Sequence, residues 1–383
     1  MRPHSALIAS AVLSVLAISV SGLQAQTPSR LENWSPSKIK PPRIDHHIRS
    51  TPENLAWGWL GSDTQPVYRV KSGDIAKIDT ISMGGMRDDN YQEFLKNLDI
   101  PLDHPVVKEM IAARLQVQPS GLPAGTGGHM LTGPIYIEEA EPGDVLEIRI
   151  WDNQFRVPYG NTGAGPGSGG LPELLTKREQ KIYTYDYSKG WANFNDDIKV
   201  PLEPFMGVMG VAPSKAQANR VGSRSPGNFG GNIDLRDLTS GSRMFVPVHV
   251  KGAFYFTGDA HAAQGDGEIT GPAIETCLTT VQQFIVHKNK KLKTPYFETP
   301  THYIVMGMNV DLDLAMKMAM QETNEWLVEN KGLTKFEAYS LSSVAVSYRN
   351  TVIVNGNLGM HGMIPKSLWI KDKSPYWYTT EGL

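Results

Sequence analysis

The sequence predicts a mainly β protein with α+β elements, on the basis of its composition and its alternating segments. The chain has 383 residues, and its 37 glycines and 26 prolines stand against 20% charged residues. Glycine and proline interrupt helices and favour turns, so this composition is typical of many short strands. In the stretch VLEIRI, apolar residues alternate with Glu147 and Arg149, which indicates a half-buried strand.

The N-terminus is typical of a secretory signal. Arg2 and His4 give a short polar or basic start, residues 6–20 form an apolar run, and Ala25 ends a cleavage-site pattern. The run is too short to span a bilayer comfortably. We expect export to the periplasm or the medium, with a mature chain that begins near Gln26 and has no stable membrane insertion. An uncleaved anchor is the alternative.

The elements of the mature chain follow from local patterns. Residues 26–64 are polar and rich in proline, which predicts an extended lead-in segment. A single helix is expected at 105–115, where apolar residues recur at helical spacing. Pro247 favours an edge or irregular strand for 244–250, because proline cannot donate to a ladder. The remaining expected strands are two within 67–81, then 144–152, 182–187, 198–202 and 279–287.

The C-terminal part is predicted to contain two helices. Apolar residues recur at helical spacing over 311–330, and Gly332 provides a stop signal. Thr334 and Glu337 have the spacing of a capping box that opens a second helix. The stretch VIVNGNLGMHGMIPK then predicts a strand, an Asn-Gly turn and a glycine-flanked bend at His361.

The net charge and the cysteine content exclude several classes of protein. The formal net charge is −2 and the sequence has no clustered basic patch, which excludes nucleic acid and anionic membrane surfaces as main partners. Cys277 is the single cysteine, so the chain has no internal disulfide. Cys277 begins an expected strand, which favours a buried inert thiol over a nucleophile paired with Glu275.

The stretch GDAHAAQGDGEITGPAIE, residues 258–275, has the composition of a functional site. It places five residues of ligand or acid–base type among glycines that allow tight turns: Asp259, His261, Asp266, Glu268 and Glu275. Asp259 and His261 are expected to share a face of a strand that enters the loop. A solvated glycine-rich turn is the alternative.

These residue types suit a divalent metal, which acidifies water and polarises a carbonyl oxygen. Those are two requirements of amide hydrolysis, and an acid must also protonate the leaving nitrogen. The candidates in the loop are Asp259, His261 and Glu268, and His129 and Asp234 are more distant ones. The glycine-rich segment around Ser168 lacks the lysine of a serine amidase, so it favours a surface loop.

Several ordered pieces of the chain, within about residues 67–367, resemble the acetamidase/formamidase family. They are GGHMLTGPIYIEEAEPGDVLEIRI, FMGVMGVAP, GNIDLRDLTSGS, GDAHAAQGDGE, ETPTHYIVMGM and VNGNLGMHGMIPK. The resemblance implies consecutive sandwich-like and barrel-like β parts and a C-terminal α/β part. The expected divisions are a signal peptide at 1–25, a lead-in at 26–64, β-rich parts at 65–200 and 201–290, and the α/β part at 291–383.

The resemblance also implies a function and a site. It implies a homodimer that hydrolyses formamide, acetamide or another short amide to a carboxylate and ammonia by metal-activated water. Zinc is the expected ion and calcium the alternative. The implied ligands are His129, Asp234, Asp259, His261 and Glu268, and the implied acid–base residues are Asp259, Glu268 and Glu275. His302 and His361 stay undecided. The alternatives are hydrolysis of another C–N bond and a non-catalytic binding protein with this fold.

Overall fold

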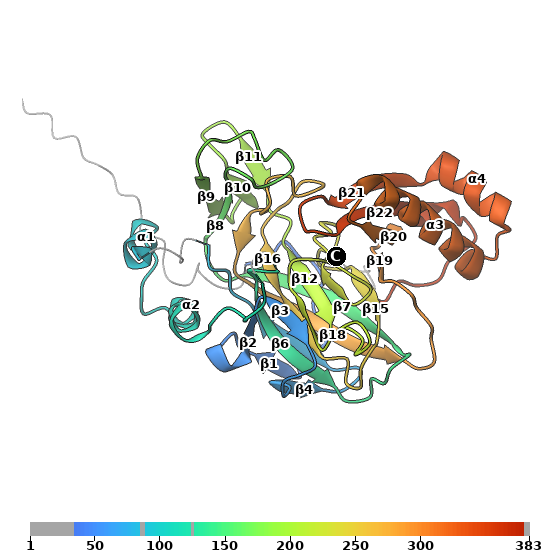
Figure 1. Ribbon diagram of the computed structural model, residues 1–383, viewed down its shortest axis with the longest axis horizontal. Coiled ribbons are helices and arrows are strands. Elements are labelled where there is room, and N and C mark those ends of the chain that lie inside the picture. The colour runs from blue at the N-terminus through green and yellow to red at the C-terminus, as the bar shows by residue number, and fades with distance from the viewer. Residues whose placement is uncertain (1–33, 85–88, 124–125, 379–383) are drawn as a thin grey trace, which may run out of the picture.

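The computed structural model describes residues 34–84, 89–123 and 126–378, and strands dominate these ranges (Figure 1). The predicted fold class is therefore confirmed. One sheet has nine strands in the order β1-β5-β18-β7-β15-β19-β20-β22-β21. Their bounds, in that order, are His46–Ile48, Ile75–Asp79, Leu278–His287, Val145–Phe155, Arg243–Pro247, Tyr296–Glu298, His302–Asn309, Leu358–Pro365 and Ser347–Val352.

A second sheet has eleven strands, and it carries the stretch singled out above. Its main path is β11-β10-β9-β8-β17-β16-β12-β14, and β6 lies beside β16 and pairs with β2 and β4. The bounds are Lys199–Pro201, Trp191–Asn193, Glu179–Asp186, Tyr159–Ala164, Glu275–Thr276, Tyr255–His261, Phe205–Val211, Gly230–Asn232, Met130–Ile137, Leu55–Trp57 and Tyr68–Val70. A small third sheet pairs β3 (Trp59–Gly61) with β13 (Arg220–Gly222).

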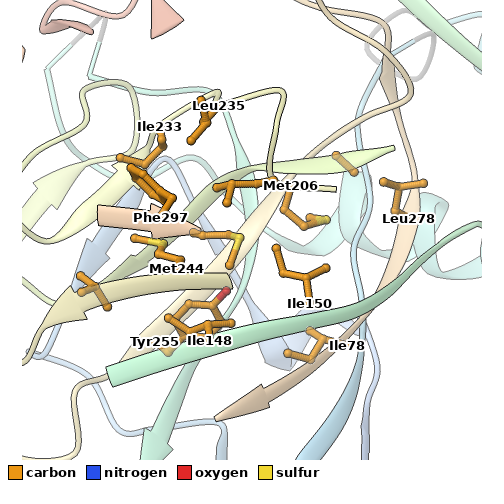
Figure 2. Packing of buried hydrophobic residues seen from close by; sticks show 14 of the residues in the cluster. Ile78, Ile148, Ile150, Met206, Ile233, Leu235, Met244, Tyr255, Leu278 and Phe297 are labelled. Carbon is orange, nitrogen blue, oxygen red and sulfur yellow. The ribbon is translucent and has the colours of Figure 1, made fainter. Parts of the chain in front are cut away.

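The main hydrophobic core lies between the two large sheets (Figure 2). Ile148 and Met244 come from the nine-stranded sheet, and Met206 and Tyr255 come from the eleven-stranded one. Burial of such side chains stabilises the fold by about 25 cal/mol for each Å² of apolar surface removed from water. The hydroxyl of Tyr255 donates to Gln282 Oε1 at 2.8 Å, which satisfies a polar group inside this core.

The two C-terminal helices are those that the sequence predicted. Helix α3 (Leu312–Lys331) begins after the N-cap Asp311 and ends at Gly332, which has a left-handed conformation. Helix α4 (Lys335–Ala345) begins with a complete capping box between Thr334 and Glu337. Helix α3 packs on β20 and β22 (Figure 1).

Elsewhere the helices differ from the prediction in one respect. Helix α2 (Pro105–Gln116) confirms the expected helix, but α1 (Tyr91–Asn97) precedes it, so the prediction of a single helix was wrong. Helix α1 has seven residues, which is too short to show a clear apolar period. Short 3₁₀ turns are at Pro52–Asn54 and Lys366–Leu368.

Two local predictions for strands were wrong. Of the two alternatives for 244–250, the edge strand is wrong, because β15 pairs with both β7 and β19. The strand ends at Pro247, beyond the pairing with β19. His361 lies inside β22 and not in a bend. Its neighbour Gly362 serves close packing instead, because a Cβ atom there would lie 2.6 Å from Thr323 Oγ1 of helix α3.

The hydrogen-bonded sheets cross the boundaries that the sequence predicted between parts. Within residues 26–64, the expected lead-in, β1 joins the nine-stranded sheet and β2 joins the eleven-stranded one. Non-local pairing of this kind leaves no signal in local sequence patterns. The predicted signal peptide, residues 1–25, lies outside the described residues. Among the described helices, none combines the length and the apolar character that crossing a membrane requires.

Candidate functional site

Strand β16 brings two of the predicted residues together in the centre of its sheet. The strand changes neighbours at Asp259: Gly258 pairs with Leu131 of β6, and Ala260 pairs with Thr276 of β17. The predicted strand that enters the loop is therefore present. Asp259 Oδ2 lies 3.6 Å from His261 Nε2. His261 is fully buried, and its ring packs edge-on against Phe205 of β12 at 5.0 Å between centroids.

Further carboxylates surround the His261 ring. Glu275 Oε1 lies 3.2 Å from Nε2, and Glu268 Oε1 lies 3.8 Å from the same atom. On the other side of the ring, Asp234 Oδ1 lies 3.8 Å from Nδ1. Both ring nitrogens and Asp234 Oδ1 are buried without a hydrogen-bond partner. Buried polar atoms without a partner are uncommon in proteins, and a bound ion or an ordered water molecule is a usual explanation for them.

His129 completes what we call the carboxylate–histidine cluster. Its Nε2 lies 3.6 Å from Asp259 Oδ2, and its Nδ1 is 2.9 Å from Ser223 Oγ. The residue lies directly before β6, the neighbour of β16. A hydrogen bond at one ring nitrogen orients the other, which leaves Nε2 available to a ligand. The cluster consists of His129, Asp234, Asp259, His261, Glu268 and Glu275.

Asp234 and Glu268 are held by contacts with distant parts of the chain. Asn355, in the connection between β21 and β22, donates a short hydrogen bond from Nδ2 to Asp234 Oδ2. The side-chain amide of Gln264 donates from Nε2 to the backbone carbonyl oxygen of Asp234 at 2.8 Å. Glu268 follows Gly267, which forms a parallel bridge with Val352 of β21. The C-terminal part therefore positions two members of the cluster.

Three members of the cluster have a strained backbone. The φ angles of Asp234, Asp259 and Glu268 are 49°, 56° and 50°. Residues other than glycine seldom adopt this left-handed region, and each such residue costs about 1–3 kcal/mol. Strain of this kind concentrates at functional sites because the surrounding structure maintains it. No pattern in the sequence predicts these angles.

The burial of so many like charges shifts their pKa values. Burial and the charge of Asp259 raise the pKa of Asp234 to about 7. Burial and the charge of Asp234 raise the pKa of Glu268 well above its ordinary value, and burial also raises the pKa of Glu275. Burial disfavours the charged form of Asp259 too, but the charges of His129 and His261 outweigh it and lower its pKa.

His261 has the opposite balance of charges. Burial lowers the pKa of an imidazole, but the carboxylates of Glu275 and Asp259 outweigh this effect and raise the pKa well above 6.5. The cluster therefore attracts positive charge strongly, whether as a proton on His261 or as a cation. Two overlapping sets have their ligand atoms within 4.8 Å of one another, namely Asp234, His261 and Glu268, and Asp259, His261 and Glu275.

A cavity of about 670 Å³ opens beside the cluster and makes it reachable. Asp259, Glu268, Glu275 and His129 are among the residues that line it. Strands β8 and β9 and the loop between them supply another part of the lining. The cavity is wide enough for a small-molecule ligand, since such pockets measure about 300–1,000 Å³.

Other residues considered from the sequence lie outside the cluster. Asp266 forms an ion pair with Arg349 on β21. His302 contacts the hydroxyl of Thr301, and Nδ1 of His361 contacts Thr351. The prediction of a buried Cys277 is confirmed, and burial raises the pKa of its thiol to about 11. A thiol with this pKa is a poor nucleophile at neutral pH.

Sequence reasoning missed two residues that support the cluster. Asn355 lies 121 positions from Asp234 in the chain, so no local spacing connects them. Gly207, in β12, leaves room for the carboxylates, because a Cβ atom there would lie 2.4 Å from Asp234 Oδ1 and 2.8 Å from Asp259 Oδ2. The repeated glycines of FMGVMGV are the one signal that points to a close approach at this strand.

The fold and this cluster define a class of protein: a two-sheet β protein whose central strands bury a group of carboxylates and imidazoles suited to a divalent cation. The model of the Acetamidase/Formamidase family matches residues 123–226 and 216–369 of the chain. The chain therefore belongs to the acetamidase/formamidase family, as the resemblance implied.

Individual relatives agree with this assignment. The chain is 29% identical over 316 residues to a formamidase of Methylophilus methylotrophus. This alignment covers 63% of this chain and 76% of the relative. It is 28% identical over 255 residues to a putative formamidase of Schizosaccharomyces pombe, covering 52% of this chain and 56% of the relative. The crystal structure of an acetamidase from Bacillus halodurans has a TM-score of 0.69 and 26% identity, and covers 85% of this chain and 100% of that one.

Proposed function

We propose that the protein hydrolyses short linear amides such as formamide and acetamide. In this reaction a water oxygen bonds to the amide carbon, the C–N bond breaks, and the nitrogen leaves as ammonia with a carboxylate as the other product. Membership of the family and the names of the relatives support this proposal. The observation that carries it is the His261 ring, which is buried without hydrogen bonds among carboxylates and beside a cavity.

We further propose that a divalent metal, zinc first, binds at the cluster. The residues fit this ion: imidazole and carboxylate are ligand types of zinc, and three of their buried atoms lack any partner. The ligands would be His129, Asp234, Asp259, His261 and Glu268. The bound ion would supply polarisation of the amide carbonyl and a lower pKa for a water molecule.

The protein residues have distinct roles in this proposal. Asp259 has a lowered pKa, so its carboxylate stays ionised and accepts a proton from the attacking water. Burial raises the pKa values of Glu268 and Glu275, so these carboxyl groups bind a proton more readily than exposed ones do. Glu275 lines the cavity, and its carboxyl group can deliver that proton to the leaving nitrogen.

Ammonia release from formamide, acetamide and propionamide tests the proposal. The purified protein is assayed as prepared, after chelation, and after zinc or calcium is restored, beside His261→Ala and His302→Ala. His302 is the matched control because it lies outside the cluster. We expect metal-dependent release that is lost with His261→Ala and kept with His302→Ala. No release by folded, metal-replete protein, together with retained amide binding in calorimetry, would favour a binding protein instead.

Export and dimerisation are two further proposals. We propose that residues 1–25 are removed, which an intact mass that corresponds to a chain beginning near Gln26 would support. We propose a homodimer through the C-terminal helices, since Phe336, Tyr339 and Val344 of α4 are 80%, 65% and 78% exposed. Light scattering of the wild type and of Phe336→Glu tests this, and a monomeric wild type would contradict it.

A further inference from the structure

The cavity beside the cluster is much larger than a short amide. Acetamide has four non-hydrogen atoms, whereas a cavity of about 670 Å³ is in the range that holds a ligand several times that size. The cluster supplies one end of the lining. From Asn161, which pairs with Glu275, the lining runs along the β8–β9 hairpin to an opposite side that includes Gly163, Ser168 and the segment 178–180. A substrate whose amide reaches the cluster therefore leaves room for a further group.

This opposite side is fixed relative to the cluster. It belongs to strands β8 and β9 and to the loop between them. Thr162 Oγ1 donates to the Pro272 carbonyl at 3.0 Å, and the Gly170 amide donates to the Ile269 carbonyl at 2.8 Å. Ile269 is next to Glu268. Because the same short loop carries Glu268 and holds the opposite side, the two sides keep their separation.

Among the described residues that line the cavity, Arg178 is the only arginine or lysine. It is exposed, and it forms no hydrogen bond or ion pair within the described residues. Its neighbours behave differently, because Lys177 Nζ pairs with Glu179 Oε1 at 3.1 Å. The guanidinium is thus a free cation with a fork of donors suited to a carboxylate.

The charges of the cavity are separated along it. Asp259, Glu268 and Glu275 belong to the cluster and repel an anion, whereas Arg178 lies further along the hairpin, beside Gly165, and attracts one. Glu179 also lines the cavity, but Lys177 pairs with it. A substrate that carries both a neutral amide and a carboxylate would bind in one orientation only. The carboxylate would go to Arg178, and the amide would be left at the cluster.

We propose that the preferred substrate is a short linear amide whose acyl chain ends in a carboxylate, and that Arg178 binds this carboxylate. The inference rests on the proposed amidase function and deepens it by naming the substrate class. Arg178 is a specificity-determining residue here, not a catalytic one. A charge-assisted pair of this kind changes affinity by about 10-fold to 100-fold.

Half-amides of dicarboxylic acids test this proposal. The ratio of kcat/KM for malonamic, succinamic or glutaramic acid to kcat/KM for butyramide is measured with metal-replete protein. The three acids sample the distance between the cluster and Arg178. We expect the best acid to exceed butyramide, and Arg178→Gln to lower the ratio by about 10-fold to 100-fold, mainly through KM. Arg43→Gln is the matched control, because Arg43 does not line the cavity, and it should leave the ratio unchanged.

The outcomes separate this inference from the proposed function. Hydrolysis of butyramide without any preference for an acid overturns the inference and keeps the amidase. The same holds if Arg178→Gln and Arg43→Gln change the ratio equally. If no amide is hydrolysed, the proposed function fails. Calorimetry with succinamic acid then decides whether Arg178 binds a carboxylate. Weaker binding to Arg178→Gln than to wild type then supports the carboxylate site, and equal or absent binding overturns it.

Discussion

Arg349 binds Asp266 with two hydrogen bonds, from Nε at 2.8 Å and from Nη2 at 2.5 Å. The two residues are 83 positions apart, and they join strand β21 to the loop that carries Glu268. Arg349 also approaches Asp237 at 3.4 Å. Because Gly267 bridges Val352 of the same strand, the C-terminal part holds the loop at two points.

We therefore expect Arg349→Lys to affect activity more than stability. Lysine cannot reproduce the two parallel bonds, so the loop that carries Glu268 loses one of its two attachments to β21. The pair is partly exposed, and its loss should change the free energy of unfolding by about 1 kcal/mol or less. We expect kcat/KM for amide hydrolysis to fall roughly 10-fold to 100-fold.

The control is Arg43→Lys, which changes an ion pair with Asp45 at 2.7 Å, far from the cluster. Kinetics and thermal unfolding of both variants check the expectation. Equal effects of the two substitutions on kcat/KM would show that Arg349 does not position the loop.

Local patterns predicted much of the fold, because strands and helices leave periodic signals of their own. The alternation in β7 and the capping box of α4 are examples. The order of the sheets leaves no such signal, so β1 and β2 were missed within an apparent lead-in. Pro247 suggested an edge strand for a related reason. Proline is tolerated where one neighbouring strand no longer pairs, and the sequence does not show that the pairing with β19 ends before Pro247.

Local sequence likewise predicts some residues of the site and misses others. The glycine-rich loop marks Asp259, His261, Glu268 and Glu275 by composition, and all four lie in the cluster. Asn355 has no local mark, because its role depends on a contact across 121 positions. The left-handed backbone of the cluster arises from tertiary constraint and is likewise invisible in a single sequence.

Gly207→Ala should disrupt the cluster through volume alone. Gly207 does not have a positive φ angle, so the substitution adds no backbone strain. Its new Cβ atom would lie 2.4 Å from Asp234 Oδ1 and 2.8 Å from Asp259 Oδ2, and these carboxylates must move. We expect the free energy of unfolding to fall by about 1–3 kcal/mol and metal content to drop.

Gly121→Ala is the matched control, because a Cβ atom there would meet nothing within 4 Å. Thermal unfolding and the metal content of the purified variants check both effects. A Gly207→Ala protein with the metal content and stability of Gly121→Ala would contradict this account of the packing.

Asn355→Leu should weaken binding of the proposed metal at Asp234. The change keeps a side chain of similar size but removes the donor to Asp234 Oδ2, so this ligand loses the contact that orients it. Outer contacts of metal ligands typically contribute 10-fold to 100-fold in affinity, so we expect a loss of about this size. Competition with a chromophoric chelator measures it.

Asn357→Leu provides the comparison, since Asn357 lies in the same connection and donates to the Pro226 carbonyl at 2.9 Å. Among the described residues Asn357 bonds to Pro226 and not to the cluster, so the affinity of this variant for metal should stay close to that of the wild type. Similar losses in the two variants would mean that a general disturbance of this connection, and not the Asp234 contact, is responsible.

His361 should make the protein less stable in acid. Burial and the charge of Arg349 lower the pKa of His361 from 6.5 to about 3, and Asp266 opposes this only in part. The unfolded chain therefore binds a proton between pH 6.5 and 3 that the folded protein does not bind. Stability due to this residue is complete above pH 6.5 and falls by about 1.4 kcal/mol for each pH unit below it.

Unfolding by urea at several pH values between 7 and 4.5 tests this with the wild type and His361→Gln. Glutamine does not titrate, so the variant should lose less stability than the wild type over that range, even if it is less stable at pH 7. Thr351 Oγ1 contacts Nδ1 of His361 at 2.7 Å, and glutamine need not keep this contact, which accounts for such an offset. Parallel stability profiles for the two proteins would show that the imidazole titrates normally, and that burial in β22 does not keep it neutral.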